Sequence, residues 1–142
     1  MMGLTKKGEY AIRGMIYLAG QPEGKISLLS EIADATEAPA TFLAKTFQAF
    51  VKNGLVRSFR GSGGGFTLGR PAANITLREV VETVEGPILP NRCLLDDGAC
   101  GRRGGCGVHG VWRKVQKQMV DTLDEVSLAD LAQAPQEFCC PQ

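Results

Sequence analysis

The sequence lacks any long uninterrupted apolar run. In its amino-terminal stretch, MMGLTKKGEYAIRGMIYLAG, Glu9 and Arg13 interrupt the apolar residues, so the hydrophobic segment of a secretory signal is missing. No window reaches the roughly 18 apolar residues that a membrane span needs. These absences predict a cytoplasmic protein with no membrane partner. Cytoplasmic thiols are normally kept reduced, which disfavours disulfides among the five cysteines.

The sequence also shows no nucleophile–base pair and no paired carboxylates, and it holds a single histidine. General acid–base and nucleophilic catalysis depend on such groups. We therefore predict that the protein is not an enzyme. Repeats and low-complexity tracts are absent too, and 142 residues can bury about one core.

The net charge of +1 is uninformative, but its distribution is not. Residues 1–70 carry nine Lys and Arg against five Asp and Glu, whereas residues 71–142 carry seven against ten. A basic amino-terminal half suits a chain whose first part meets a polyanion. Random surface charge would give similar numbers, so this observation needs support from the motifs.

Three helices are predicted in the first 55 residues. Thr5 is a suitable N-cap for a helix over residues 6–19, which carries apolar residues at helical spacing. A short helix follows in SLLSEIADA, with Ser27 as its cap and with Leu28 and Leu29 packing inward. The third runs through ATFLAKTFQAFVKNG, with Pro39 at its first position and Gly54 as its stop.

The third helix has two different faces. Leu43, Phe47, Phe50 and Val51 recur at the spacing of a buried stripe. A second stripe consists of polar residues that can donate hydrogen bonds to phosphates and base edges: Thr41, Lys45, Gln48 and Lys52. A solvated helix face has the same pattern, so this stripe alone is weak evidence for DNA binding.

A basic hairpin is predicted directly after that helix. Two short runs, Leu55–Arg60 and Phe66–Leu68, flank the turn sequence GSGGG. Helices followed by such a hairpin are typical of a winged helix-turn-helix, in which the third helix enters the major groove and the wing reaches the adjacent backbone or minor groove. A hairpin without a ligand is the alternative. The predicted DNA-binding residues are Thr41, Lys45, Gln48, Arg60, Gly61, Ser62, Gly63 and Gly64.

The second half is also predicted to be mainly helical. Thr76 is expected to cap a short helix, and from Val108 an apolar stripe runs through Trp112, Val115 and Met119 to Val126. Such a stripe marks a helix packed along another helix, and we interpret it as a dimerisation helix of a homodimer. The expected organisation is a winged helix-turn-helix over residues 1–70, a ligand-binding loop and dimerisation helix over residues 71–134, and a flexible tail over residues 135–142. The fold class is thus mainly α with a small β-hairpin wing.

Three cysteines and the only histidine lie in RCLLDDGACGRRGGCGVHG, at Cys93, Cys100, Cys106 and His109. Zinc sites usually bring two ligands together as C-x₂₋₄-C, and here only Cys106 and His109 lie that close. The wider, glycine-rich gaps suit a loop around a larger group such as an iron–sulfur cluster. The spacing favours a cluster, with a zinc ion, redox thiols or unused cysteines as the alternatives.

The chain resembles the winged-helix iron–sulfur repressors of the Rrf-two (Rrf2) family, typified by IscR and NsrR. The resemblance rests on LTKKGEYAIR, KNGLV, RGSGGGF and the Cys/Cys/Cys/His loop, and it extends to SLADL. It implies a 2Fe–2S or 4Fe–4S cluster on Cys93, Cys100 and Cys106. It also implies a dimer that binds double-stranded promoter DNA according to iron–sulfur status, nitric oxide or redox state.

The resemblance leaves the fourth ligand open. IscR-type members place a matching histidine at the position of His109, whereas NsrR-type sensors use an acidic residue at the position of Glu9 of the partner subunit. Two departures stand out: Ala44 replaces a glutamate common in IscR-like recognition helices, and Ala38 occupies an expected capping position. Rival interpretations are a regulator with a structural zinc ion and a cluster-free regulator controlled by a protein partner.

Overall fold

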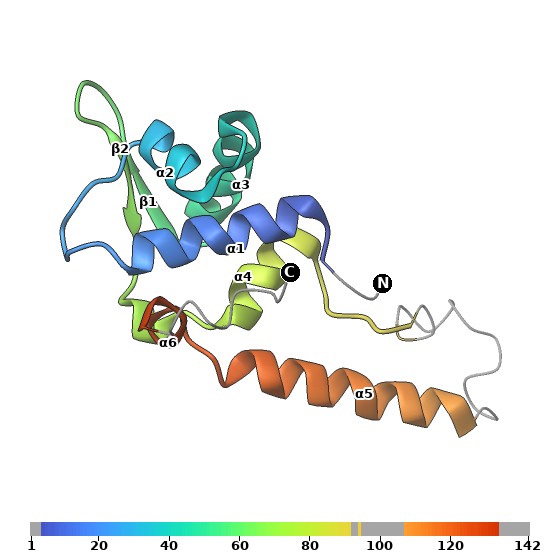
Figure 1. The fold of residues 1–142 in the computed structure, drawn as a ribbon. Coiled ribbons are helices and arrows are strands. Elements are labelled where there is room, and N and C mark those ends of the chain that lie inside the picture. The colour runs from blue at the N-terminus through green and yellow to red at the C-terminus, as the bar shows by residue number, and fades with distance from the viewer. Residues whose placement is uncertain (1–3, 92–93, 95–106, 134–142) are drawn as a thin grey trace.

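The computed structural model describes residues 4–91, 94 and 107–133. Its element order is α1 (Lys6–Ala19), α2 (Leu29–Thr36), α3 (Ala40–Lys52), β1 (Val56–Phe59), β2 (Gly65–Leu68), the short 3₁₀ turn η1 (Ala72–Asn74), α4 (Leu77–Glu85), α5 (Gly107–Asp124) and α6 (Leu128–Gln133). Helices and one hairpin account for this part of the chain, which confirms the predicted fold class (Figure 1). Among these helices none is long and apolar enough to cross a membrane.

Helix α1 lies at the centre of the fold and contacts α2, α3, α4 and α6. It begins as predicted, because the Thr5 hydroxyl accepts a hydrogen bond from the Gly8 amide at 3.2 Å. Near the middle of its inward face α1 carries Gly14, where an added Cβ atom would lie 2.9 Å from the Phe47 ring. Gly14 therefore allows α1 and α3 to approach closely.

The start of α2 differs from the prediction. Ser27 does not cap the helix; its backbone exchanges two hydrogen bonds with Phe66 and adds a bridge to the hairpin. The N-cap position belongs to Leu28, which has no capping side chain and is 46% exposed. The predictions of a Ser27 cap and an inward Leu28 are therefore wrong, because pairing with a distant strand outweighs a local cap and turns Leu28 outward.

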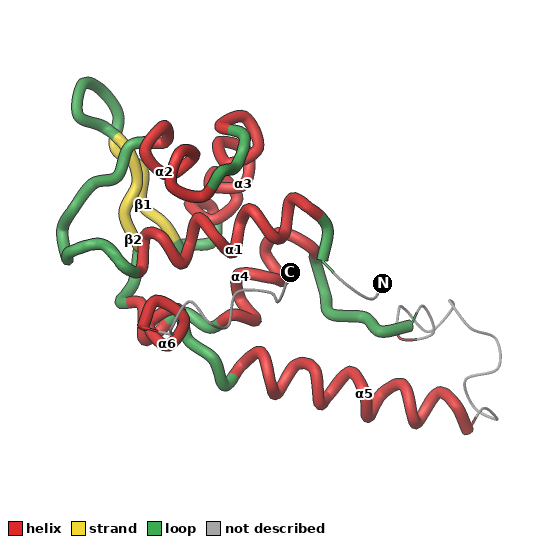
Figure 2. The backbone as a smooth tube through the Cα atoms, viewed as in Figure 1, coloured by secondary structure: helices red, strands yellow, loops and turns green. Residues whose placement is uncertain are grey.

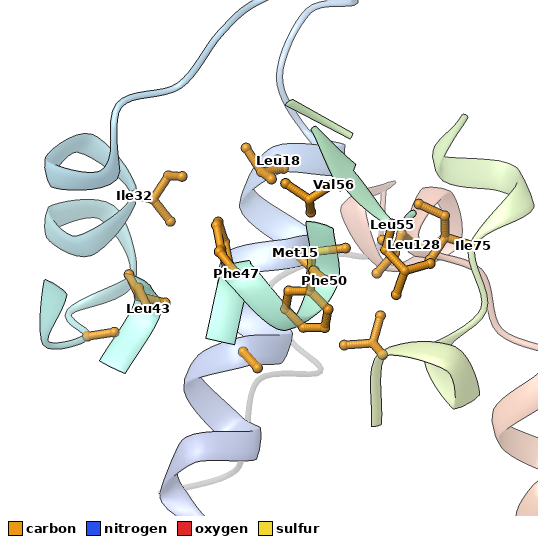
Figure 3. Packing of buried hydrophobic residues seen from close by; sticks show 13 residues of the cluster. Met15, Leu18, Ile32, Leu43, Phe47, Phe50, Leu55, Val56, Ile75 and Leu128 are labelled. Carbon is orange, nitrogen blue, oxygen red and sulfur yellow. The ribbon is translucent and has the colours of Figure 1, made fainter. Parts of the chain in front are cut away.

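Helix α3 follows the predicted pattern closely. Pro39 is its N-cap, so the capping position is one residue later than Ala38 and the first helical residue is Ala40; no side chain caps α3. Its last residue is Lys52, followed by Asn53 and by Gly54 at φ +76°. Leu43, Phe47 and Phe50 are fully buried as predicted, whereas Val51 is only half-buried. These side chains pack against Met15, Ile32 and Val56 in the core shown in Figure 3.

One hydrophobic core serves most of the chain. Ile75, Val80 and Leu128 belong to the same buried cluster as the side chains of α1 and α3, so the core continues past residue 70. Helix α4 starts with a capping box in which Thr76 and Glu79 satisfy each other's backbone amides. Residues 126–128 pair with residues 75–77, where the Leu77 amide donates to the Val126 carbonyl at 2.8 Å.

Helix α5 runs along one side of this body (Figures 1 and 2). It packs on α4 but has no fully buried residue. It ends at Asp124, so the apolar stripe does not continue along the helix to Val126 as expected. Val126 lies instead in the turn that pairs with the start of α4.

Candidate nucleic-acid interface and ligand-bearing helix

The polar stripe of α3 is exposed. Thr41, Lys45, Gln48 and Lys52 all lie on the solvent side, opposite the buried Phe47 and Phe50. Among the described residues, none of these four side chains makes a hydrogen bond or an ion pair with another side chain. The donors of this face are therefore available to a ligand, as recognition of phosphates and base edges requires.

The hairpin forms the predicted wing. Strands β1 and β2 pair antiparallel with Val56 opposite Leu68 and Phe59 opposite Gly65, and Phe66 packs edge-to-face on Phe47 at 5.1 Å. This aromatic contact attaches the wing to the recognition helix. Arg60 and the residues after it extend beyond the strands as an exposed loop, which Figure 2 shows projecting from the body.

The glycines of the wing tip have conformational roles of their own. Gly61 and Gly63 adopt φ values of +92° and +80°, which side-chain-bearing residues rarely adopt. The Gly64 amide donates to the Gly61 carbonyl at 3.0 Å, so this N–H closes the turn and is not free for a phosphate. Of the predicted wing contacts, Arg60 and Ser62 are exposed side chains.

Unpaired cations mark this side of the molecule. Lys45, Lys52, Arg57 and Arg60 make no ion pair within the described residues. Some cations elsewhere are paired: Arg70 with Glu79 at 2.7 Å, and Lys117 with Asp121 at 2.6 Å. Lys7, Arg113 and Lys114 also lack an ion pair among the described residues. The sequence analysis missed Arg57, which alternates outward from the buried Val56 on β1; strand periodicity is the signal that would have found it.

An electrostatic cluster holds α1 against the start of α2. The Tyr17 hydroxyl and the Lys25 ammonium both donate to the Glu31 carboxylate. The hydrogen bonds from Lys25 and Tyr17 lower the pKa of Glu31, and the bond to Glu31 raises the pKa of Tyr17. The helix-turn-helix is thereby fastened to α1 by charge as well as by packing.

His109 lies in the first turn of α5 and is half-buried. Its Nδ1 atom is buried and has no hydrogen-bond partner in the part of the chain that the structure describes. Buried polar atoms in proteins are normally satisfied, so an unpaired imidazole nitrogen calls for an explanation such as a ligand. The alternative to a ligand role for His109 is a helix-start residue with a backbone partner, and Nδ1 has no such partner among the described residues.

Most of the other predicted ligands cannot be placed relative to His109. Cys93, Cys100 and Cys106 lie outside the described residues, as do Cys139 and Cys140 of the tail. Glu9 is in the first turn of α1, where its carboxylate lies 3.7 Å from the Lys6 ammonium. Within the described part of the chain, no three His, Cys, Asp or Glu side chains form a metal-binding group.

Comparison with known proteins identifies the family. The family model Rrf2, described as an iron-dependent transcriptional regulator, matches residues 4–134. The chain belongs to the Rrf2 family. The resemblance inferred from its motifs is thus confirmed, and the chain is a DNA-binding transcriptional regulator and not an enzyme.

Rrf2 relatives of two kinds are similar to this chain. The HTH-type transcriptional regulator IscR of Escherichia coli K12 is 34% identical over 132 residues, covering 92% of this chain and 80% of IscR. The structure of T. potens IscR has a TM-score of 0.76 at 27% identity, covering 99% of this chain and 93% of that one. CymR, described as the global cysteine regulator of B. subtilis, has a TM-score of 0.75 at 30% identity, covering 93% and 97%.

Proposed function

We propose that this Rrf2 regulator is a homodimeric repressor whose affinity for promoter DNA responds to an iron–sulfur cluster. The cluster would be held by Cys93, Cys100, Cys106 and His109, and the signal would be iron–sulfur status, nitric oxide or redox state. The observation that carries the proposal is the buried, unpartnered Nδ1 of His109, three positions after Cys106. Three thiolates and one imidazole form a donor set suited to such a cluster.

Dimerisation is supported by the exposed edge of α5. Val108 and Val111 are 57% and 59% exposed, and they continue into a shallow groove lined by Val115, Met119 and Leu123. Because these apolar side chains follow one edge of the helix, a second copy of the chain would bury them in a helix–helix contact. A two-fold dimer would also present two recognition helices to a two-fold DNA site.

The mechanism follows from where these groups lie on the chain. A bound cluster would supply a centre that reacts with oxidants and nitric oxide. His109 binds a metal only as neutral imidazole, and it lies on the same helix as the exposed valines. Ligand binding at the start of α5 would therefore bias the separation of the two recognition helices. Successive major-groove sites lie about 34 Å apart, so DNA affinity depends on that separation.

The metal is tested by analysing anaerobically purified protein. We expect iron, acid-labile sulfide and visible charge-transfer absorption in the wild type, and loss of all three in Cys100→Ala. Stoichiometric zinc without sulfide would contradict the proposal and favour a structural zinc site. For measurements of DNA binding, the probe is a duplex that the wild-type protein selects from a random DNA library.

The fourth ligand is tested by comparing His109→Ala with Glu9→Ala for the anaerobic spectrum and for iron content. We expect His109→Ala to change both and Glu9→Ala to retain both. The opposite result would assign the ligand to Glu9 of the partner subunit. A second candidate function is a cluster-free regulator controlled by a protein partner, because CymR, described as a cysteine regulator, is about as similar in structure as IscR. It predicts DNA binding by protein without iron that is unchanged on reconstitution with iron and sulfide.

A further inference from the structure

The carboxylate of Glu85 lies at the carboxyl-terminal end of its own helix and contacts the amino-terminal end of another. Glu85 is the last residue of α4, where the helix dipole disfavours a negative charge. Its Oε1 atom accepts hydrogen bonds from the backbone amide of Thr5, at 3.2 Å, and from the Thr5 hydroxyl. These groups form the amino-terminal end of α1, where the dipole favours an anion.

The contact is also close in space to the first turn of α1. A Cβ atom on Gly8 would lie 2.4 Å from the Glu85 Oε1 atom, so the carboxylate reaches this position only because residue 8 is a glycine. Thr5 and Glu85 are 80 positions apart in the sequence, and α1 and α4 form one of the largest helix–helix contacts of the fold. The carboxylate thus joins the amino-terminal end of α1 to the carboxyl-terminal end of α4.

On one side, this contact leads to the ligand-bearing helix. After Gly86 the chain continues through the buried Ile88, whose carbonyl accepts a hydrogen bond from the Gln116 side chain of α5 at 3.0 Å. Segment 86–91 therefore follows Glu85 directly and contacts α5 through the hydrogen bond at Ile88. This segment is the covalent connection between Glu85 and a residue in contact with α5.

On the other side, the contact leads to the recognition helix. Tyr10, two residues after Gly8, packs edge-to-face on Phe42 in the first turn of α3, with ring centroids 6.2 Å apart. The Arg13 guanidinium lies 5.7 Å from the Tyr10 ring centroid and 3.5 Å from the Thr36 carbonyl at the end of α2. A shift of the start of α1 therefore acts on both helices of the helix-turn-helix.

We propose that Glu85 is a positioning residue that couples α5 and the segment before it to the recognition helix by capping α1. The inference rests on the proposed function, since it supplies the physical route by which a ligand on α5 changes DNA affinity. The route is a contiguous set of contacts, and a coupling between its ends is what an experiment must demonstrate.

Glu85→Ala and Gly8→Ala break the contact from opposite sides. Glu85→Ala removes the acceptor. Its conservative counterpart Glu85→Gln keeps an acceptor oxygen and should retain most of the coupling. Gly8→Ala displaces the carboxylate with a methyl group while favouring helix formation in α1, so a loss of helix propensity cannot explain its effect. The matched control is Glu82→Ala, one turn earlier on α4, where the carboxylate pairs with Arg78.

The first readout requires neither metal nor DNA. Hydrogen exchange of the metal-free full chain should become faster in the first turn of α3 in Glu85→Ala and in Gly8→Ala, and should be unchanged in Glu82→Ala. Exchange at α3 that is identical to wild type in both contact variants would overturn the inference. This outcome is independent of whether the protein holds a cluster.

The second readout is the ratio of DNA affinities of metal-loaded and metal-free protein, measured with the selected duplex. Wild type should show a ratio in the range of about 5- to 150-fold that is typical of allosteric coupling. Glu85→Ala and Gly8→Ala should retain iron and sulfide but bring this ratio close to one. A variant ratio equal to that of wild type would overturn the inference. A wild type with no iron or with no such ratio would contradict the proposed function, and the exchange experiment would still decide the role of Glu85.

Discussion

Helices α3 and α5 each carry an apolar stripe, but the two stripes are buried to different extents. In α3 the stripe is covered by α1, α2, the hairpin and α4: Leu43, Phe47 and Phe50 are inaccessible, and Val51 is half-buried. In α5 the stripe is only half covered by α4, and two valines stay more than half exposed. Similar amphipathic patterns can therefore end up fully buried or partly exposed, depending on what the neighbouring elements cover.

The largest expected effect is on the core side of this comparison. Phe47 packs on Phe50 and Phe66 and is fully buried, so Phe47→Ala should lower the free energy of unfolding by about 3–5 kcal/mol. Urea denaturation monitored by circular dichroism measures this change. A loss below about 1 kcal/mol would mean that the body is not packed as described.

On α5 a substitution in the apolar stripe should weaken the proposed dimer and leave the stability of the monomer nearly unchanged. Val111→Asp adds a charge to the exposed apolar edge, so the dimer–monomer midpoint should move to at least about tenfold higher concentration. The monomer should lose no more than about 0.5 kcal/mol of unfolding free energy, as expected for an exposed site. Analytical ultracentrifugation over a range of concentrations is the measurement, with Lys117→Ala as a control away from that edge. An unchanged midpoint would exclude this edge as the dimer contact.

The unpaired Lys45 and Arg60 should differ from the paired Lys117 of α5 in their effect on DNA. Lys45→Ala and Arg60→Ala should each weaken binding across sequences and lower the slope of log K against log salt by roughly one unit. Lys117→Ala, which removes a cation paired with Asp121, should leave the slope unchanged. Fluorescence anisotropy at several salt concentrations distinguishes these variants. If all three variants behave alike, the proposed docking face is wrong.

The smallest expected effect concerns pH and the start of α4. Burial raises the pKa of Glu79, but the hydrogen bonds from Arg70 and from the Thr76 amide outweigh it and hold the pKa below its ordinary value of 4.5. The resulting stabilisation is present above pH 4.5 and is lost as the pH falls through the lowered pKa. The Glu79 side chain is 38% exposed, so we expect a contribution below about 1 kcal/mol. Denaturation of wild type and Glu79→Gln should differ at pH 7 and converge in acid.

Most of the elements could be predicted because their signals are local. The spacing of Leu43, Phe47 and Phe50 specifies which face of α3 is buried, and Thr76 with Glu79 specifies where α4 begins. The candidate DNA-binding side chains on α3 follow from the same periodicity. The wing was predictable from GSGGG, although only the structure shows that the Gly64 amide donates a hydrogen bond that closes the turn.

The failures concern contacts between distant segments. Ser27 is a good cap by composition, yet it pairs with Phe66, and Val126 continues an apolar spacing but lies beyond the end of α5. No local pattern indicates that the backbone of Ser27 forms two hydrogen bonds with Phe66 of the hairpin. The same holds for Glu85, whose partner Thr5 belongs to the other end of the chain.

The amino-acid sequence by itself therefore determined the helical periods, the caps at Thr5 and Thr76, the glycine-tipped wing and the family of the protein, since each depends on residues close together in the chain. Only the tertiary structure decided which apolar stripe is covered, which cations stay unpaired and which carboxylate caps α1. These properties arise when elements from distant positions pack around one core, because each side chain's neighbours are then set by the whole arrangement and not by its own segment.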